Sequence, residues 1–146
     1  MITSFLGIGS AENDNPGYFS LNSGHEATGG GVETEVGNWI PINCLIGGLQ
    51  LKTASTAVGA GKTVTATLMV NSSPTDISVQ VNEGESGGKD SRAVRILAGD
   101  FVSIRFEKTG SGSTPAFHYY ILAQGNAIIF LGSTGGESLA GFRTGS

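Results

Sequence analysis

The stretch VGAGKTVTATLMVNSS, residues 58–73, contains the choice on which the fold depends. Its letters GKT end the phosphate-binding loop of many nucleotide-binding proteins, in which a glycine-rich turn opens a helix. Thr56 stands where that loop requires its first glycine. After Lys62, apolar residues alternate with threonines, which is the pattern of a half-buried β-strand. We therefore predict a turn that leads into a strand over 63–70, and no nucleotide site.

The composition fits a single domain that is rich in turns. The chain of 146 residues is long enough to enclose its own core. Glycine accounts for 24 of the 146 residues, which is more than the usual share of about 7%. Charged residues make up 14% of the chain, which is less than the usual share of about 25%. The sole cysteine, Cys44, cannot form an internal disulfide, which fits synthesis in a reducing compartment.

Charge and hydropathy also indicate which partners to expect. The net charge is −4, and the 8 Lys and Arg residues are scattered, which argues against a nucleic-acid partner. No segment approaches the roughly 18 consecutive apolar residues of a membrane span. The N-terminus lacks the basic and apolar regions of a signal peptide. We expect neither nucleic acid nor membrane among the partners.

Strand signals recur along the chain, whereas helical periodicity is almost absent. Gly47-Gly48 interrupts one strand and indicates a bulge or a close approach, and Gly99-Asp100 indicates a tight turn. The pattern predicts an antiparallel sandwich, with jelly roll, immunoglobulin-like sandwich and small barrel as the remaining architectures. The other predicted strands are 18–21, 36–43, 45–53, 77–81, 94–96, 101–107, 117–123 and 127–131, with 63–70 and 77–81 forming a hairpin.

Catalytic groups do not form a recognisable pattern. No motif places His25 or His118 beside a nucleophile and an acid. Glu33 and Glu35 alternate in a possible strand and would point the same way, as in a glycan hydrolase, but a solvated strand face is the simpler interpretation. We predict no catalytic residue and no bound cofactor, and hence a protein that is not an enzyme.

Metal-binding residues lack the necessary spacing as well. The acidic loops 12–15 and 83–90 contain oxygen ligands for Ca²⁺, but neither follows the EF-hand pattern. Two histidines and one cysteine without zinc-site spacing do not indicate a zinc site. We predict no metal site.

The strand at 117–123 is apolar or aromatic on both faces. Such a strand needs a second cover in addition to its own core. Another subunit is one candidate for this cover, and a loop of the same chain is the other.

The order of motifs over residues 36–123 resembles that of small jelly-roll domains on the outside of tailed bacteriophage virions. These domains are related in architecture to the trimeric tumour necrosis factor and complement-type globular heads. The resemblance rests on NWIPI, GGLQL, TLMVN ending at Asn71, and the AGD turn at 98–100. The sequence departs from the pattern at Ser72, where glycine is expected.

The resemblance implies an all-β antiparallel β-sandwich, a jelly roll of about eight strands. The domain would cover 18–132, with flexible arms at 1–17 and 133–146. It also implies a homotrimer in which the strand at 117–123 faces the threefold axis. The residues expected at that axis are Phe117, Tyr119 and Tyr120.

The implied function is that of a non-enzymatic virion protein assembled in the host cytoplasm. As a capsid decoration, or cement, protein it would bind the major capsid protein on the capsid exterior, and the short chain with arm-like ends favours this role. The alternative is a receptor-binding fibre tip that recognises a host glycan or protein through loops such as 82–92 and 107–115. The partner-binding candidates in the arms are Phe5, Leu6, Leu139 and Phe142.

Overall fold

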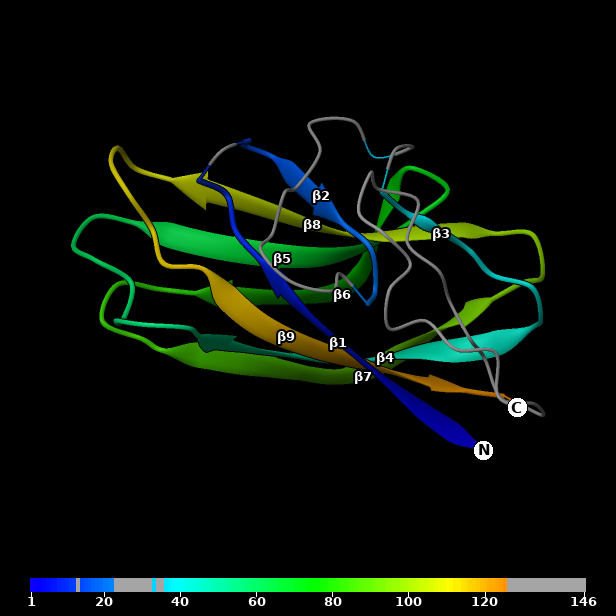
Figure 1. The fold of residues 1–146 in the computed structure, drawn as a ribbon. Coiled ribbons are helices and arrows are strands. Elements are labelled where there is room, and N and C mark those ends of the chain that lie inside the picture. The colour runs from blue at the N-terminus through cyan, green and yellow to red at the C-terminus, as the bar shows by residue number, and fades with distance from the viewer. Residues whose placement is uncertain (13, 23–32, 34–35, 126–146) are drawn as a thin grey trace.

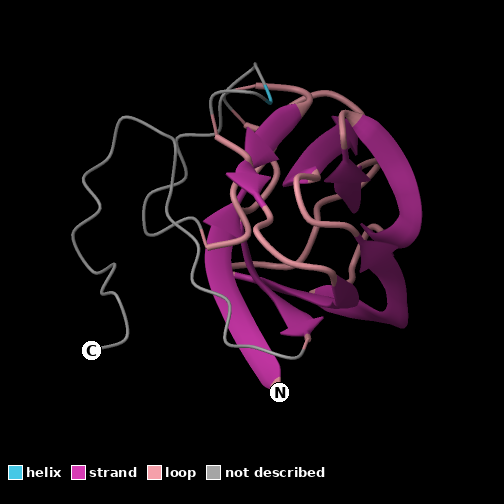
Figure 2. Ribbon diagram, turned by 90° about the vertical axis from the view of Figure 1, so that its right-hand side faces the viewer, coloured by secondary structure: helices cyan, strands magenta, loops and turns pink. Residues whose placement is uncertain are grey.

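The computed structural model describes residues 1–12, 14–22, 33 and 36–125. Two antiparallel sheets pack face to face, and the described residues contain no α-helix (Figure 1). Figure 2 looks roughly along the strands and shows them arranged around a common interior. The predicted all-β antiparallel sandwich is therefore confirmed.

Each sheet combines strands from distant parts of the sequence. Sheet I contains β1 (Ile2–Gly9), β9 (Phe117–Gln124), β4 (Cys44–Thr53) and β7 (Gly87–Ile96), in that order. Sheet II contains β2 (Gly17–Phe19), β8 (Phe101–Thr109), β5 (Thr63–Val70) and β6 (Ser73–Val81), in that order, and β3 (Asn38–Trp39) also pairs with β8. Apart from β3 and the β5–β6 hairpin, the chain changes sheet at each connection, which is the wrapping of a jelly roll.

Strand β5 follows the alternation that its sequence predicts. Val64, Ala66 and Leu68 are buried between the sheets, whereas the residues at 63, 65, 67 and 69 point outward. Thr63 and Thr65 are half-buried there, and Thr67 and Met69 are buried. Hydrogen bonding to β8 on one side and β6 on the other leaves β5 with no free edge. Burial of each Val or Leu side chain contributes roughly 1.5–3 kcal/mol, so this strand is a central part of the core.

Aromatic side chains fill the middle of the core. The ring of Phe106 on β8 lies 5.4 Å from that of Phe19 and 5.7 Å from that of Tyr119, centroid to centroid. Phe117 lies 6.2 Å away from the same ring. Gly9 makes room for this cluster, because a Cβ there would lie only 2.3 Å from Phe106 Cε2. The core therefore joins β2 and β8 of sheet II to β1 and β9 of sheet I.

Turns form where the sequence predicts them. Asn71 and Ser72 connect β5 to β6 with φ angles of 49° and 65°, so the two strands form the predicted hairpin. The positive φ at Ser72 explains why glycine is expected there. Gly99, with a φ of 92°, forms the turn between β7 and β8. The strand register shifts at Gly47-Gly48, which confirms the predicted bulge.

The predicted N-terminal arm is wrong for most of its length. Residues 1–17 were expected to be flexible, but Ile2–Gly9 is a full strand that pairs along its whole length with β9. The sequence ITSFLGIG lacks strict alternation, and its strand conformation depends on hydrogen bonds to a partner more than a hundred positions later. The predicted strand at 127–131 and the predicted arm at 133–146 lie outside the described residues.

The second difference concerns the polar stretch before residue 94. It was expected to be a loop, but strand β7 begins at Gly87. Its middle is polar because β7 lies at the edge of sheet I and most of its side chains face solvent. The loop over 82–92 that was considered for receptor binding is thus confined to 82–86.

Candidate functional site

The outer face of sheet I is the most distinctive surface of the described molecule. Because side chains alternate along each strand, the register defines which residues share this face. They form four rows from β1 across to β7. The rows are Ile2, Gln124, Leu45, Arg95; Ser4, Leu122, Gly47, Ala93; Leu6, Tyr120, Gln50, Lys89; and Ile8, His118, Lys52, Gly87.

One half of this face is an apolar strip, which consists of Ile2, Leu6, Ile8, Tyr120 and Leu122 on β1 and β9. The exposed fractions are 63% for Ile2, 66% for Leu6 and 38% for Tyr120. Leu6 lies directly opposite Tyr120, whose hydroxyl hydrogen-bonds to Gln50 Oε1 and holds the ring across the sheet. Adjacent exposed apolar side chains on one face of a sheet are typical of an interaction surface.

The other half is a basic strip, which consists of Lys52, Lys89 and Arg95 on β4 and β7. All three side chains are exposed. The ion pairs found among the described residues involve other cations, those of Arg92, Arg105 and Lys108. The basic strip therefore presents its charge to solvent.

Two of the three predicted trimer-interface residues are in the wrong place for that role. Phe117 and Tyr119 are fully buried between the sheets, and Tyr119 Oη donates a 2.5 Å hydrogen bond to the carbonyl oxygen of Ser20. A side chain inside its own subunit cannot contact a neighbour. Tyr120 lies on the opposite face of the same strand and is exposed, so it alone remains a candidate.

The predicted partner-binding residues also include both a buried and an exposed side chain. Phe5 belongs to the core, so the assignment of this residue to a partner contact is wrong. Leu6, its neighbour, points outward as part of the apolar strip. Leu139 and Phe142 lie outside the described residues.

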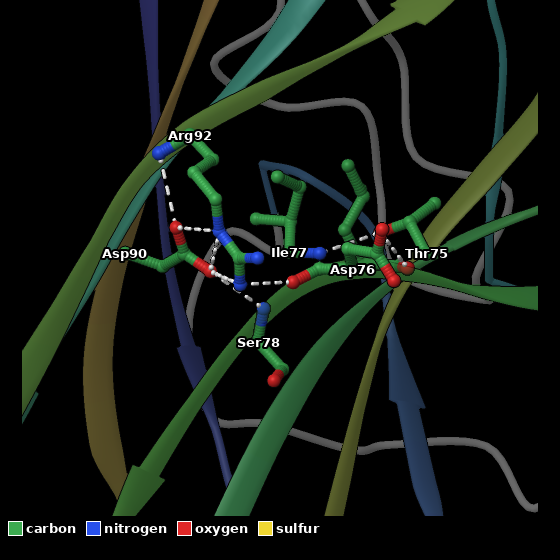
Figure 3. Close-up of polar contacts among 7 residues, drawn as sticks. Thr75, Asp76, Ile77, Ser78, Asp90 and Arg92 are labelled. Carbon is green, nitrogen blue, oxygen red and sulfur yellow. Dashed lines mark hydrogen bonds and ion pairs between the residues drawn. The ribbon is translucent and has the colours of Figure 1, made fainter.

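A cluster of charged groups closes the side of the sandwich at which β6 and β7 meet (Figure 3). Both oxygens of the Asp90 carboxylate accept hydrogen bonds from the Arg92 guanidinium, from Nε at 3.0 Å and from Nη2 at 2.7 Å. Asp90 Oδ2 also accepts from Ser78 N of β6 at 3.1 Å, and Arg92 Nη2 donates to the carbonyl oxygen of Asp76. The cluster joins the two sheets along edges that do not pair with each other.

Electrostatics in this cluster favour the ionised carboxylate. The hydrogen bonds from the Arg92 side chain are the main reason that the pKa of Asp90 falls to about 2. The Asp90 side chain is only 7% exposed but that of Arg92 is 63% exposed, so solvent screens this pairing in part. Since every oxygen of the carboxylate is occupied by a structural partner, we assign the cluster to stability and not to chemistry.

The carboxylates that were considered for catalysis or metal binding are also engaged within the protein. Ser103 Oγ donates a 2.6 Å hydrogen bond to Glu33 Oε1 in a buried position, and Glu35 lies outside the described residues. Glu12 accepts hydrogen bonds from Thr114 N and Thr114 Oγ1 and pairs with Lys108. The backbone hydrogen bond from Thr114 is the main cause of the lowered pKa of Glu12.

The histidines and the metal ligands add no further site in the described part of the chain. His118 lies exposed in a row of the outer face, and His25 is outside the described residues. No three metal-ligating side chains come together among the residues that the structure describes. Within the same residues, no helix has the length and apolarity needed to cross a membrane.

The GKT turn serves the sandwich itself. Gly61 has a φ of 71°, and its N–H donates a 3.0 Å hydrogen bond to Glu83 Oε2. Lys62 Nζ donates to the carbonyl oxygen of Ser113 at 2.8 Å, and β5 begins at the next residue. The predicted turn that leads into a strand is confirmed.

Two comparisons with known proteins, one with family models and one with curated proteins, give no match for this chain. No model of a protein family matches it, and no curated protein is significantly similar to it. Its functional assignment therefore depends on its own residues.

Sequence reasoning named Leu6 and Tyr120 as contact candidates without placing them on one surface, and it missed the basic strip. Lys52, Lys89 and Arg95 are separated by up to 43 positions, and only the pairing of β4 with β7 brings them onto one surface. Ile2 and Leu6 lie on the outer face because residues 2–9 form a strand, whereas the sequence predicted a flexible arm there. Alternation within ITSFLGIG was the one available signal, and its adjacent Phe5 and Leu6 obscured it.

Proposed function

We propose that this chain is a non-enzymatic structural protein of a tailed bacteriophage virion, a homotrimeric decoration protein that binds the outer surface of the head. The single observation that carries the proposal is the apolar strip on β1 and β9. A subunit that leaves Leu6 and Tyr120 exposed side by side has a surface suited to association. The jelly-roll wrapping is consistent with the motif order on which the virion resemblance rests.

The strip also accounts for how association occurs without loss of the fold. Its side chains point away from the core, so a neighbour can cover them without repacking the interior. Leucine, isoleucine and tyrosine bury large apolar areas, and tyrosine retains a polar group that can stay hydrogen-bonded. In this proposal Tyr120 lies near the threefold axis and Leu6 lies beside it.

The test has two parts, which are the mass of the protein in solution and its binding to expanded capsids. Light scattering after size-exclusion chromatography at micromolar concentration is expected to give three times the subunit mass. Cosedimentation with expanded capsids that lack the protein is expected to saturate. A monomer that also fails to bind such capsids contradicts the proposal.

A second candidate function is recognition of a host surface glycan as a fibre tip, and one observation favours it. Trp39 on sheet II is 66% exposed, and its ring centroid lies 5.0 Å from that of the buried Phe101, which contacts the indole at an interplanar angle of 56°. An exposed, supported indole offers a flat apolar face to a sugar ring. Binding of the isolated protein to a glycan array, lost in Trp39→Ala and kept in Tyr120→Ala, would favour this candidate over decoration.

A further inference from the structure

Charge is segregated on this molecule. The chain carries more acids than bases, with a net charge of −4, yet the strand residues that the structure describes on the outer face of sheet I include no carboxylate. Its charged side chains are those of the basic strip, Lys52, Lys89 and Arg95. The acidic residues that the structure describes lie in loops, on sheet II, or in the cluster between β6 and β7. They are Glu12, Asp14, Glu33, Asp76, Glu83, Glu85, Asp90, Asp100 and Glu107.

The basic strip also differs from the other described cations in its lack of an internal role. Arg92 pairs with Asp90 at 2.7 Å and Arg105 with Glu107 at 3.3 Å. Lys62 donates to a backbone carbonyl oxygen. No ion pair or hydrogen bond within the described chain occupies the side chains of the basic strip. Exposed cations that form no ion pair within the described chain create a locally positive potential on an otherwise acidic protein.

The spacing of the strip suits an extended contact. Lys52 lies opposite Gly87 and Lys89 lies opposite Gln50, so the two lysines are diagonal neighbours about 7–8 Å apart at their Cα atoms. Arg95 lies farther along β7, about 20 Å from Lys89 at the usual rise of a strand. The strip is therefore long enough to meet several separate charges on a partner.

Apolar side chains next to the strip point to the class of partner. Leu45 lies directly opposite Arg95 and is 45% exposed. Leu97, which follows the end of β7, is also exposed. Leucine and arginine side by side are typical of a protein interface, whereas a nucleic-acid site needs more cations than three on a chain that is acidic overall.

We propose that the basic strip is a docking surface for an acidic patch on another protein, with Leu45 and Leu97 as the apolar contacts beside it. Complementary charge of this kind steers encounter and sets orientation, and apolar contact then slows dissociation. The inference goes beyond the proposed function, because it names the chemistry of the partner surface and does not depend on a capsid or on a trimer.

Poly-L-glutamate is a suitable probe, because it presents carboxylates on a polypeptide. Fluorescence anisotropy of labelled poly-L-glutamate at low ionic strength is expected to report saturable binding that weakens as salt screens the charges. The triple variant Lys52→Gln, Lys89→Gln, Arg95→Gln is expected to weaken binding about tenfold or more. Its far-UV spectrum and melting temperature should match wild type, since all three side chains are exposed.

A matched pair of single variants separates the strip from net charge. Lys89→Gln and Lys62→Gln each remove one positive charge, but only Lys89 belongs to the strip. Lys89→Gln is expected to weaken binding, and Lys62→Gln is expected to leave it unchanged. Equal effects of the two would overturn the proposal, as would wild-type affinity in the triple variant.

Other occupants of the strip give different results in the same assay. The wild-type protein is compared on duplex DNA, on vesicles of phosphatidylserine and phosphatidylcholine, and on poly-L-glutamate. The proposal is overturned if the protein binds the DNA or the vesicles more tightly than it binds poly-L-glutamate. A change of subunit mass in the triple variant, with no change in probe binding, would overturn it in favour of a second copy. Failure of the protein to bind capsids contradicts only the proposed function, because the probe assay contains no capsid.

Discussion

Asn71 and Asp100 lie 29 positions apart in the chain and are joined by a 2.9 Å hydrogen bond from Asn71 Nδ2 to Asp100 Oδ1. Asn71 Oδ1 in turn accepts from Phe101 N at 2.9 Å, and Asp100 Oδ2 accepts from Leu97 N at 2.8 Å. The turn after β5 and the turn before β8 are thus held together at one end of the sandwich. Two of the motifs that carry the virion resemblance form a single structural unit.

Removal of the Asn71 side chain should therefore destabilise the fold. Asn71→Ala loses both side-chain hydrogen bonds and places alanine at a φ of 49°, so we expect a loss of about 2 kcal/mol in the free energy of unfolding. Urea denaturation measures it. Ser72→Gly is the control, because it relieves a φ of 65° without touching this network, and it should stay within about 1 kcal/mol of wild type. Wild-type stability in Asn71→Ala would contradict the assignment.

The Asp90–Arg92 pair should make stability depend on acid pH. The folded-state pKa of Asp90 is lowered from 3.8 to about 2, so its contribution is complete above pH 3.8 and disappears as pH falls through 2. The shift sets an upper limit of about 2 kcal/mol on this contribution, because solvent screens the 63% exposed Arg92 side chain. Asp90→Asn should be less stable than wild type at pH 7, and the difference should narrow toward pH 2. Asp76→Asn is the control, since Arg92 hydrogen-bonds only to the backbone oxygen of Asp76, and the charge of Asp76 has the smallest of the effects on the pKa of Arg92.

The hydroxyl of Tyr119 should matter for stability and not for assembly. Tyr119→Phe leaves the carbonyl oxygen of Ser20 without this buried donor, which is expected to cost about 1–2 kcal/mol of unfolding free energy. The subunit count from light scattering should not change. Tyr120→Phe removes a hydroxyl from an exposed position and should cost less than about 0.5 kcal/mol. A larger cost for Tyr120→Phe than for Tyr119→Phe would reverse the placement of the two rings.

Charge introduced into the apolar strip should disrupt association. Leu6→Lys places an ammonium group opposite Tyr120, and we expect the proposed trimer to dissociate while the melting temperature of the subunit falls little. Trp39→Lys is the matched control, because Trp39 is equally exposed, at 66%, but lies on sheet II. Light scattering over a range of concentrations measures both. Dissociation by Trp39→Lys, with no effect of Leu6→Lys, would move the interface to sheet II.

The thiol of Cys44 should react slowly in the native protein. Burial raises the pKa of this thiol and shields it from reagents, so less thiolate is available for attack. Reaction with 5,5′-dithiobis(2-nitrobenzoate) at pH 8 is expected to be at least about a hundredfold slower in buffer than in denaturant. Equal rates in the two solvents would show that β4 opens readily.

Strand positions were predictable wherever the local pattern was strong. The alternation over 63–70, the bulge at Gly47-Gly48 and the turn at Gly99-Asp100 all appear as expected. The full length of strand β7 was not predictable. An edge strand that faces solvent carries polar residues such as Lys89 and Ser91, and such residues are equally common in loops. Its conformation is favoured by long-range contacts with β4 and by the salt bridge of Asp90 at the edge.

The candidate site was less predictable than the fold. Phe117, Tyr119 and Tyr120 looked alike in a strand whose two faces are both apolar, and the sequence contains no signal for which face is inside. The decision depends on the aromatic cluster around Phe106, which admits Phe117 and Tyr119 and leaves Tyr120 on the surface.

The sequence by itself determined that this chain is an antiparallel β-sandwich, because alternation and glycine turns are local properties encoded by neighbouring residues. Only the tertiary structure decided that Ile2–Gly9 is a strand, and that cations as distant as Lys52 and Arg95 share one face. These features arise from hydrogen bonds between strands far apart in the chain. Such pairings fix which side of each strand meets water, and no local pattern contains that information.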